Sequence, residues 1–390
     1  MRWFILITVI LCFLYTRIFD IYPTILGDGL GYYSYLPSIF IHHDINMSYF
    51  PPNYFLCVSD ILKTVNKYTV GTSILMLPFF FTGHTITYLT KEYLNGFSYY
   101  YQFCIFIGTL FYWGAGIYFV YKILIKKIDK KTAIFTCAII TYGTGAFNYI
   151  VYEPSYSHIY SFFAISLFLW MVVNKKSDFL IGLVLGLIFM IRNMNALVIL
   201  FYIFNTKPKK FFIMLLGFFV AIIPQILYWF KQTGHFIVNP YSFKSTECYL
   251  NNLNCQIENF NWLKPKSLSV LFSLKSGLFV YYPVLIFSLL GIKSTKKYFK
   301  TIFLPSILFI LIVTYILSSW YVWSLGVSFG ERIYVDYLSI FAIFIASFLQ
   351  DIKNKKTQFL LMAVMTVFAI ITIYLTYLHW SQIYNFDKMF

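Results

Sequence analysis

The sequence predicts an all-α polytopic membrane protein, from its composition, its long apolar runs and the placement of its lysines. Of the 390 residues, 60% are hydrophobic and only 11% are charged, and the mean hydropathy is +0.72. A soluble domain carries roughly 25% charged residues, so most of this chain is expected to lie in lipid. We therefore expect a single integral membrane domain over residues 1–390.

Apolar runs long enough to cross a bilayer recur along the whole chain. A transmembrane helix needs about 20 mostly apolar residues. Clear candidates occupy residues 3–22, 98–121, 132–151, 156–173, 211–230, 278–292, 301–319, 333–349 and 358–378. No small-residue cleavage site follows the first run, so we expect an uncleaved span and not a signal peptide.

Two further runs are ambiguous, and the lysine-rich connections decide how we interpret them. Cytoplasmic loops carry an excess of Lys and Arg. All the short lysine-rich connections fall on one side if 72–90, which contains Pro78, does not cross completely. The same placement also requires that residues 179–204 form a pair of short helices bent near Arg192. This arrangement has about 11 crossings, with the N-terminus inside.

The net charge of +16 does not indicate nucleic-acid binding. The basic residues form short clusters between apolar runs and not one basic soluble face, as expected for loops that face anionic lipid. The six cysteines show no metal-binding spacing. Cys248 and Cys255 share one polar loop, where they form either a disulfide or two unpaired thiols.

Three longer connections remain for the outer side of the membrane. They are residues 23–97, 231–277 and 318–333, and we expect loop helices and functional residues to converge there. We find no internal repeat. Many secondary transporters are built from internal repeats, so this observation disfavours that class.

An acidic, glycine-rich stretch follows the first apolar run. Asp28 lies among Gly27, Gly29 and Gly31, which allow the backbone to turn sharply. A carboxylate at the membrane border costs free energy unless it has a partner or a function. We expect Asp28 to act as a general base toward an acceptor hydroxyl. The alternative is an Asp that caps a helix.

Three cations are candidates for binding a phosphate group. Arg192 lies at the tip of the predicted helix pair, Arg332 begins a span, and Lys67 follows the first loop. An Arg in the membrane is costly unless it reaches water or an anion, and its paired donors suit phosphate. The structural alternatives are snorkelling for Arg192 and interface anchoring for Lys67. For Arg332 the alternative is an ion pair with Glu331 or Asp336.

Aromatic and polar side chains expected on the same face are candidates for binding a sugar or an acceptor. They are Tyr32, Tyr33, Tyr35, Glu153, His158, Trp320, Trp323 and Glu331. An ionisable residue in a membrane span is a functional candidate by default, although His158 alternatively packs between helices. Tryptophans concentrate at membrane interfaces.

Four of these segments, in their order and placement, resemble the GT-C superfamily of polytopic glycosyltransferases. They are Gly-Asp-Gly-Leu-Gly-Tyr-Tyr-Ser-Tyr-Leu-Pro at 27–37, the stretch from 67 to 80, the stretch from 182 to 193, and the stretch from 320 to 332. That superfamily includes the protein O-mannosyltransferases and the lipid A aminoarabinose transferases. The chain looks like small bacterial members over nearly its whole length.

The resemblance implies a sugar donor on a polyprenyl-phosphate carrier and a lipid, glycan or protein acceptor. The active face would be the extracytoplasmic side of the bacterial inner membrane. Asp28 would be the base or a metal-assisted site, which allows a divalent metal, and Arg332 or Arg192 would meet the donor phosphate. The chain departs from many members in one respect, because Gly29 and not a second acid follows Asp28.

We therefore expect a GT-C-type glycosyltransferase that uses a polyprenyl-phosphate sugar. Three alternatives come from other classes. A non-catalytic transporter or flippase for lipid-linked glycans needs a polar path across the bilayer, and few charges lie within the apolar runs. A glycan ligase or polymerase needs room for a long polymer, and an assembly subunit needs no polar side chains that converge.

Overall fold

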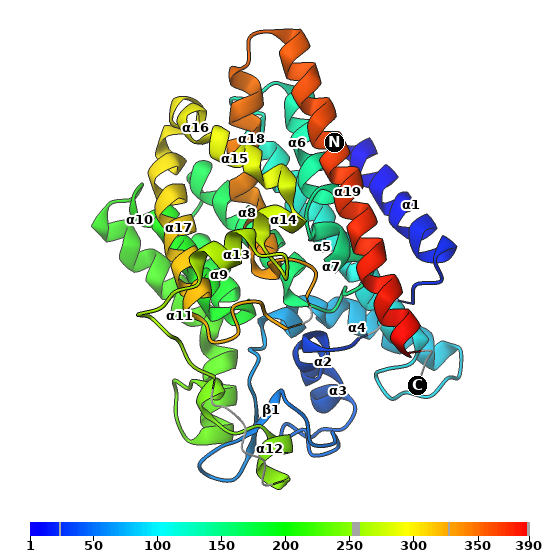
Figure 1. Ribbon diagram of the computed structural model, residues 1–390. Coiled ribbons are helices and arrows are strands. Elements are labelled where there is room, and N and C mark those ends of the chain that lie inside the picture. The colour runs from blue at the N-terminus through cyan, green and yellow to red at the C-terminus, as the bar shows by residue number, and fades with distance from the viewer. Residues whose placement is uncertain (23–24, 252–257, 327, 388–390) are drawn as a thin grey trace.

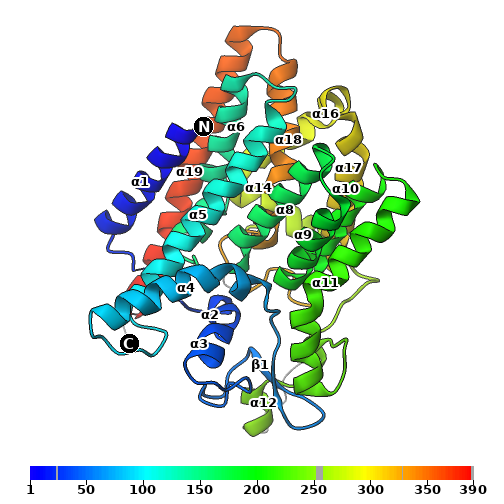
Figure 2. The ribbon, with the colours of Figure 1, turned by 180° about the vertical axis from the view of Figure 1, so that it is seen from behind.

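A computed structural model describes residues 1–22, 25–251, 258–326 and 328–387, and nearly all of its regular secondary structure is helical. Long helices form a bundle, as Figures 1 and 2 show from opposite sides. Short helices and one β-hairpin gather at one end of the bundle, which we call the loop end. Helix α16 and the connection between α18 and α19 lie at the opposite end (Figure 1).

Five helices in the described part of the chain are long and apolar enough to cross a membrane. They are α5 (Tyr99–Leu124), α11 (Pro208–Thr233), α17 (Lys300–Ser319), the continuous run of η4 (Arg332–Tyr337) and α18 (Leu338–Asp351), and α19 (Lys355–Asp387). They support the predicted all-α membrane protein. The count of about 11 crossings stays a prediction.

Shorter apolar helices complete the bundle. They are α1 (Arg2–Ile18), α6 (Lys130–Tyr142), α8 (Ser157–Val173) and α9 (Asp178–Ile191). Helix α7 (Ala146–Val151) follows α6 after a break at Gly143–Gly145, so the predicted span 132–151 is two helices and not one. Asp129 caps α6 by accepting hydrogen bonds from two backbone amides of its first turn.

The predicted span 278–292 is wrong as one continuous helix. Its residues form three short pieces, α14 (Leu278–Tyr281), η3 (Pro283–Leu285) and α15 (Ile286–Leu290), and α16 (Ile292–Tyr298) follows. Pro283 explains the first break, because proline has no N–H to donate and disfavours helical geometry in the preceding residue. Hydropathy alone does not detect such a break.

The predicted bend near Arg192 is confirmed. Helix α9 ends there, and Arg192 adopts an extended backbone with φ of −153° and ψ of 118°. The chain then continues as η1 (Asn193–Ile199) and α10 (Leu200–Ile203). The bend places the Arg192 side chain between two helical segments.

Helix α4 (Gly71–Leu89) carries Pro78 and is not among the five long apolar helices. It lies obliquely to α1 and α5 next to the loop end (Figure 2). At its start, a Cβ atom on Gly71 would collide with the backbone of Met190 and Ile191. The first loop is therefore held directly against the end of α9.

The loop end is built mainly from the first two predicted outer segments. Its elements are α2 (Asp28–Tyr33), α3 (Tyr35–Phe40), β1 (Leu56–Val58), β2 (Thr64–Asn66), η2 (Pro240–Ser242) and α12 (Thr246–Leu250). Helix α13 (Ser267–Phe272) packs against α14 and α17 instead (Figure 1). The strands pair antiparallel, with Cys57 opposite Val65, and Cys57 also bridges to Ser245. Cys255, the predicted partner of Cys248, lies outside the described residues.

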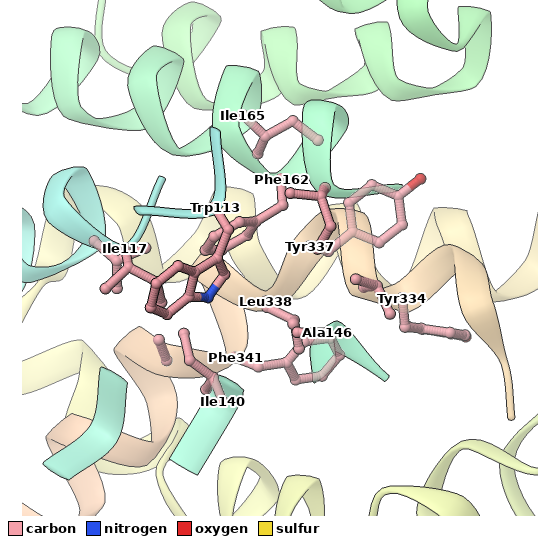
Figure 3. Close-up of a cluster of buried hydrophobic side chains, with 14 of the residues drawn as sticks. Trp113, Ile117, Ile140, Ala146, Phe162, Ile165, Tyr334, Tyr337, Leu338 and Phe341 are labelled. Carbon is pink, nitrogen blue, oxygen red and sulfur yellow. The ribbon is translucent and has the colours of Figure 1, made fainter. Parts of the chain in front are cut away.

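The core of the bundle is apolar and aromatic. Trp113, Phe162, Leu338 and Phe341 lie together inside it, from α5, α8 and α18 (Figure 3). Of the most apolar stretch within Arg332–Asp351, 89% is buried, against 22% for the corresponding stretch within α19. Helix α18 is therefore the central element, and α19 lies at the periphery with apolar side chains facing outward.

Glycines bring α9 and α11 into close contact. A Cβ atom on Gly182 would overlap the carbonyl oxygen of Met214, and one on Gly217 would overlap that of Phe179. Small residues at helix interfaces let membrane helices approach closely. This contact fixes α9, and with it Arg192 at the end of that helix.

We predict that Gly182→Ala lowers the melting temperature of the detergent-purified protein, because an added methyl must push α9 from α11. Overpacking of this kind costs roughly 1–3 kcal/mol. Gly114→Ala is the matched control, because its Cβ would have one neighbour, the Ile5 methyl carbon at 3.2 Å. Equal melting temperatures for the two variants would contradict the close contact.

Candidate functional site

An ion pair between Asp28 and Arg332 lies at the centre of the candidate site. Asp28 is the first residue of α2 and Arg332 the first residue of η4. Arg332 Nη2 lies 2.8 Å from Asp28 Oδ2, and the two side chains are 15% and 20% exposed. The structure thus joins the first outer segment to the third, as predicted. Arg332 pairs with neither Glu331 nor Asp336, and Asp28 does not cap a helix with its side chain.

Two phenols complete the environment of Asp28. Tyr68 donates a hydrogen bond to Asp28 Oδ1 over 2.6 Å, and the Tyr54 hydroxyl lies 3.4 Å from the same oxygen. Burial favours the neutral acid, but the Arg332 charge and the Tyr68 hydrogen bond outweigh it and lower the pKa of Asp28. Asp28 is therefore ionised at neutral pH.

The three glycines around Asp28 allow neighbouring side chains to approach α2. A Cβ atom on Gly29 would overlap the Ser155 hydroxyl, and one on Gly31 would overlap the Tyr68 ring. Gly27 also has a positive φ of 54°, a conformation that favours glycine. The glycines that we expected to permit a sharp turn are thus also required by close packing.

The turn between α7 and α8 covers the other side of Arg332. The guanidinium carbon lies 5.6 Å from the centre of the Tyr156 ring, within the range of a cation–π contact. Glu153 accepts a hydrogen bond from Asn148 Nδ2 over 2.8 Å. Burial raises the pKa of Glu153 to about 7, against the opposing effects of the Arg332 charge and the Asn148 hydrogen bond. A second carboxyl group therefore interacts with Arg332 from a distant segment.

A second polar network lies at the junction of α8, η1 and η4. His158 Nδ1 lies 2.7 Å from Asp336 Oδ1, and Asn195 Nδ2 donates to Asp336 Oδ2 over 2.7 Å. Arg192 Nη1 lies 3.3 Å from the same His158 nitrogen. His158 and Asp336 are 1% and 0% exposed. Asp336 and Arg332 are four residues apart on η4, so that short helix carries both networks.

Lys67 is already paired. Its ammonium lies 3.0 Å from Glu258 Oε1, which links the first outer segment to the second. The same ammonium lies within 5.7 Å of the ring centres of Tyr54, Tyr68 and Tyr241. Since Tyr54 and Tyr68 also contact Asp28, Lys67 belongs to the edge of the Asp28 site.

The predicted tyrosines of α2 and α3 have different roles. The Tyr32 ring packs against Tyr68, with 4.5 Å between centres, and therefore borders the site. The hydroxyl of Tyr33 donates to the Gly96 carbonyl over 2.5 Å, and that of Tyr35 donates to the Tyr68 carbonyl over 2.6 Å. These two buried hydroxyls hold loops in place, and neither contacts Asp28 among the described interactions.

The third outer segment contributes less than predicted. Trp320 contacts Tyr241 and Phe260, with ring centres 6.0 and 4.7 Å apart, and thus lies beyond Lys67. Trp323 packs against the main apolar core. Glu331 is 0% exposed and accepts a hydrogen bond from Ser276 over 3.2 Å.

Some residues of the site escaped the sequence analysis. Tyr54, Tyr156 and Tyr241 surround the charged groups, yet nothing distinguishes them among the 35 tyrosines of the chain. The position of Asn195 in the sequence marks it as a candidate, because it lies three residues after Arg192, where the predicted helix pair bends. The sequence suggests Asp336 only as a partner for Arg332.

The described residues do not fit a divalent metal. No group of three or more His, Cys, Asp or Glu side chains among them is arranged to hold a metal ion. Asp28 is surrounded instead by one guanidinium group and two phenols. We therefore derive no step through a metal.

The arrangement offers an ionised carboxylate, two guanidinium groups and several aromatic rings at one end of a membrane-embedded bundle. It can accept a proton, bind an anion and pack against a flat apolar group. No family model matches the chain, and neither does any curated protein or solved structure.

We predict that Glu331→Gln stabilises the protein at high pH only. Burial raises the pKa of Glu331 from 4.5 to about 8, in spite of its hydrogen bond from Ser276 and the nearby Arg332 charge. Below pH 4.5 the carboxyl is protonated in both folded and unfolded states. As the pH rises toward 8, only the unfolded state ionises freely, so the wild type loses stability relative to Glu331→Gln. The difference reaches at most about 5 kcal/mol.

Thermal unfolding at pH 5 and pH 9 measures this difference. The exposed Glu92 provides the matched control, since Glu92→Gln is expected to change neither curve. A gain for Glu331→Gln that is the same at both pH values would show that Glu331 ionises normally.

Proposed function

We propose that this chain is a membrane glycosyltransferase of the GT-C type, which moves a sugar from a polyprenyl-phosphate carrier to an acceptor hydroxyl. The observation that carries the proposal is that Asp28, Arg332 and Arg192 gather around η4. Asp28 pairs with Arg332 at the start of this helix, and Arg192 lies beside the network that Asp336 forms further along it. A base and phosphate-binding cations are what such a transfer requires. The proposed location is the bacterial inner membrane, with the loop end on the extracytoplasmic side.

Asp28 is the proposed base. The acceptor oxygen forms a bond to the anomeric carbon, and its proton passes to the Asp28 carboxylate. The bond between that carbon and the phosphate oxygen breaks, and its electron pair leaves with the polyprenyl phosphate. A single displacement of this kind inverts the anomeric configuration. The lowered pKa keeps Asp28 ionised, and the Tyr68 hydrogen bond fixes its orientation.

The cations have distinct roles in this mechanism. The donor phosphate competes with Asp28 for Arg332, so binding of the donor releases a carboxylate oxygen beside the reacting hydroxyl. Arg192 adds a second positive charge where negative charge develops on the leaving phosphate. Lys67 is held by Glu258 and closes the edge of the site.

Aromatic rings bordering the site provide surfaces for the sugar or the acceptor. Tyr32 and Tyr68 lie beside Asp28, and Tyr241 and Trp320 continue the aromatic surface toward the second outer segment. Glu153 is a further candidate for an acceptor hydroxyl, because it lies in the turn that covers Arg332. Tyr33 and Tyr35 support this surface from below through backbone hydrogen bonds.

A transporter or flippase is less well supported by the distribution of polar groups. Such a protein needs a polar path through the bundle. The centre between α5, α8 and α18 is filled with apolar side chains (Figure 3). The buried charged groups that we describe lie toward one end of α8 and α18 instead.

We predict that Asp28→Asn lowers sugar transfer by a factor of about 100 or more, the usual contribution of a general base. Purified protein in nanodiscs would be incubated with a panel of polyprenyl-phosphate hexoses and pentoses and a membrane extract as acceptor. Mass spectrometry then measures the polyprenyl phosphate that is released. Asp60→Asn, at an exposed position in the hairpin loop, is the matched control and is expected to retain activity.

Equal release by the wild type and Asp28→Asn would remove Asp28 from the mechanism. Absence of release by the wild type from the whole panel would contradict the proposed donor class. Melting temperatures of all three proteins establish that each one is folded.

A further inference from the structure

Arg192 differs from the other two predicted phosphate-binding cations in its partners. Arg332 is paired with Asp28 and Lys67 with Glu258. Within the described residues, Arg192 forms no ion pair with a carboxylate. It lies at the C-terminal end of α9, where the helix dipole favours a positive charge. Its charge is therefore stabilised by the fold without being neutralised.

Asp336, which shares His158 Nδ1 with Arg192, is already held by two other side chains. His158 holds one of its oxygens and Asn195 holds the other, each over 2.7 Å. Asn195 is itself fixed, because Tyr337 donates to its side-chain oxygen over 2.7 Å and its nitrogen lies 3.0 Å from the Ser161 hydroxyl. Asp336, His158 and Asn195 are nearly or completely buried. Each Asp336 oxygen is therefore already held by another side chain, and no ion pair joins Asp336 to Arg192 among the described residues.

The tautomer of His158 follows from this geometry. Its Nδ1 faces both Asp336 Oδ1 at 2.7 Å and Arg192 Nη1 at 3.3 Å, and it holds either a proton or a lone pair. The hydrogen bond to a carboxylate is charge-assisted and the shorter of the two, so Nδ1 carries the proton and donates it to Asp336. An Nδ1–H group cannot accept a hydrogen bond, so Arg192 Nη1 keeps its protons for another acceptor.

We propose that Asp336, His158 and Asn195 form a positioning network that holds Arg192 as an unpaired cation for the anionic phosphate of the donor. His158 Nδ1 contacts both the Asp336 carboxylate and the Arg192 guanidinium, and its hydrogen bond to Asp336 fixes the ring. Removal of the ring lets Arg192 collapse onto Asp336 as an ion pair. This inference rests on the proposed function for the identity of the anion.

Binding of a polyprenyl monophosphate to the full chain in nanodiscs tests the network without any transfer step. Arg192→Gln and His158→Ala are expected to weaken binding by a factor of 10 or more. His158→Asn is expected to stay within a factor of about 3 of the wild type, because an Asn amide nitrogen can replace Nδ1 as the donor to Asp336. A merely structural histidine would not show this rescue. Arg17→Gln, at an exposed end of α1, controls for general electrostatic attraction.

The outcomes separate this inference from the proposed function. Unchanged binding by folded Arg192→Gln or His158→Ala overturns the network, even where Asp28→Asn abolishes transfer. Equal losses in His158→Asn and His158→Ala also overturn it, as does a wild type that does not retain the probe. If the variants bind the probe as expected but the wild type transfers no sugar, the network is upheld and the proposed glycosyltransferase function is contradicted.

Discussion

The ion pair between Asp28 and Arg332 is the interaction on which the rest of the site depends. Each residue begins a short helix at the boundary between the bundle and the loop end, and the two lie 304 positions apart in the sequence. An isolated charge in this partly buried place costs several kcal/mol, whereas a pair with good hydrogen bonds is tolerated. The pair therefore fixes α2 against η4. The tyrosines that surround it, Tyr54, Tyr68 and Tyr156, are placed by the same contact.

Helix η4 connects this pair to the second network. A short helix of the 3₁₀ type rises about 2 Å per residue, so Arg332 and Asp336 are separated by roughly 8 Å along its axis. One element thus presents a cation to the first outer segment and an anion to the junction of α8 and η1. Because α18 continues η4 into the centre of the bundle, the buried core sets the position of both groups. A displacement of η4 would change the surroundings of Arg192 and Arg332 together.

The sequence predicts the helical membrane character, the bend at Arg192 and the meeting of Asp28 with Arg332, because costly charges in apolar surroundings leave few arrangements. It predicts the continuity of helices less well, since Pro283 interrupts an apolar run without changing its hydropathy. It cannot tell which tyrosines border the site. Tyr33 is the same residue type as Tyr32 and adjacent to it, and only the direction of its side chain on α2 takes it to a loop carbonyl. Long-range partners such as Tyr54 have no local signal at all.

A double-mutant cycle on the free energy of unfolding tests the central ion pair most directly. The four proteins are the wild type, Asp28→Asn, Arg332→Gln and the double variant, each unfolded by denaturant in the same detergent. Residues in direct contact show coupling energies of roughly 0.5–3 kcal/mol. We expect each single change to destabilise the protein and the double change to cost less than their sum by about 1 kcal/mol or more. Additive effects, within about 0.5 kcal/mol, would contradict the pair and the site built around it.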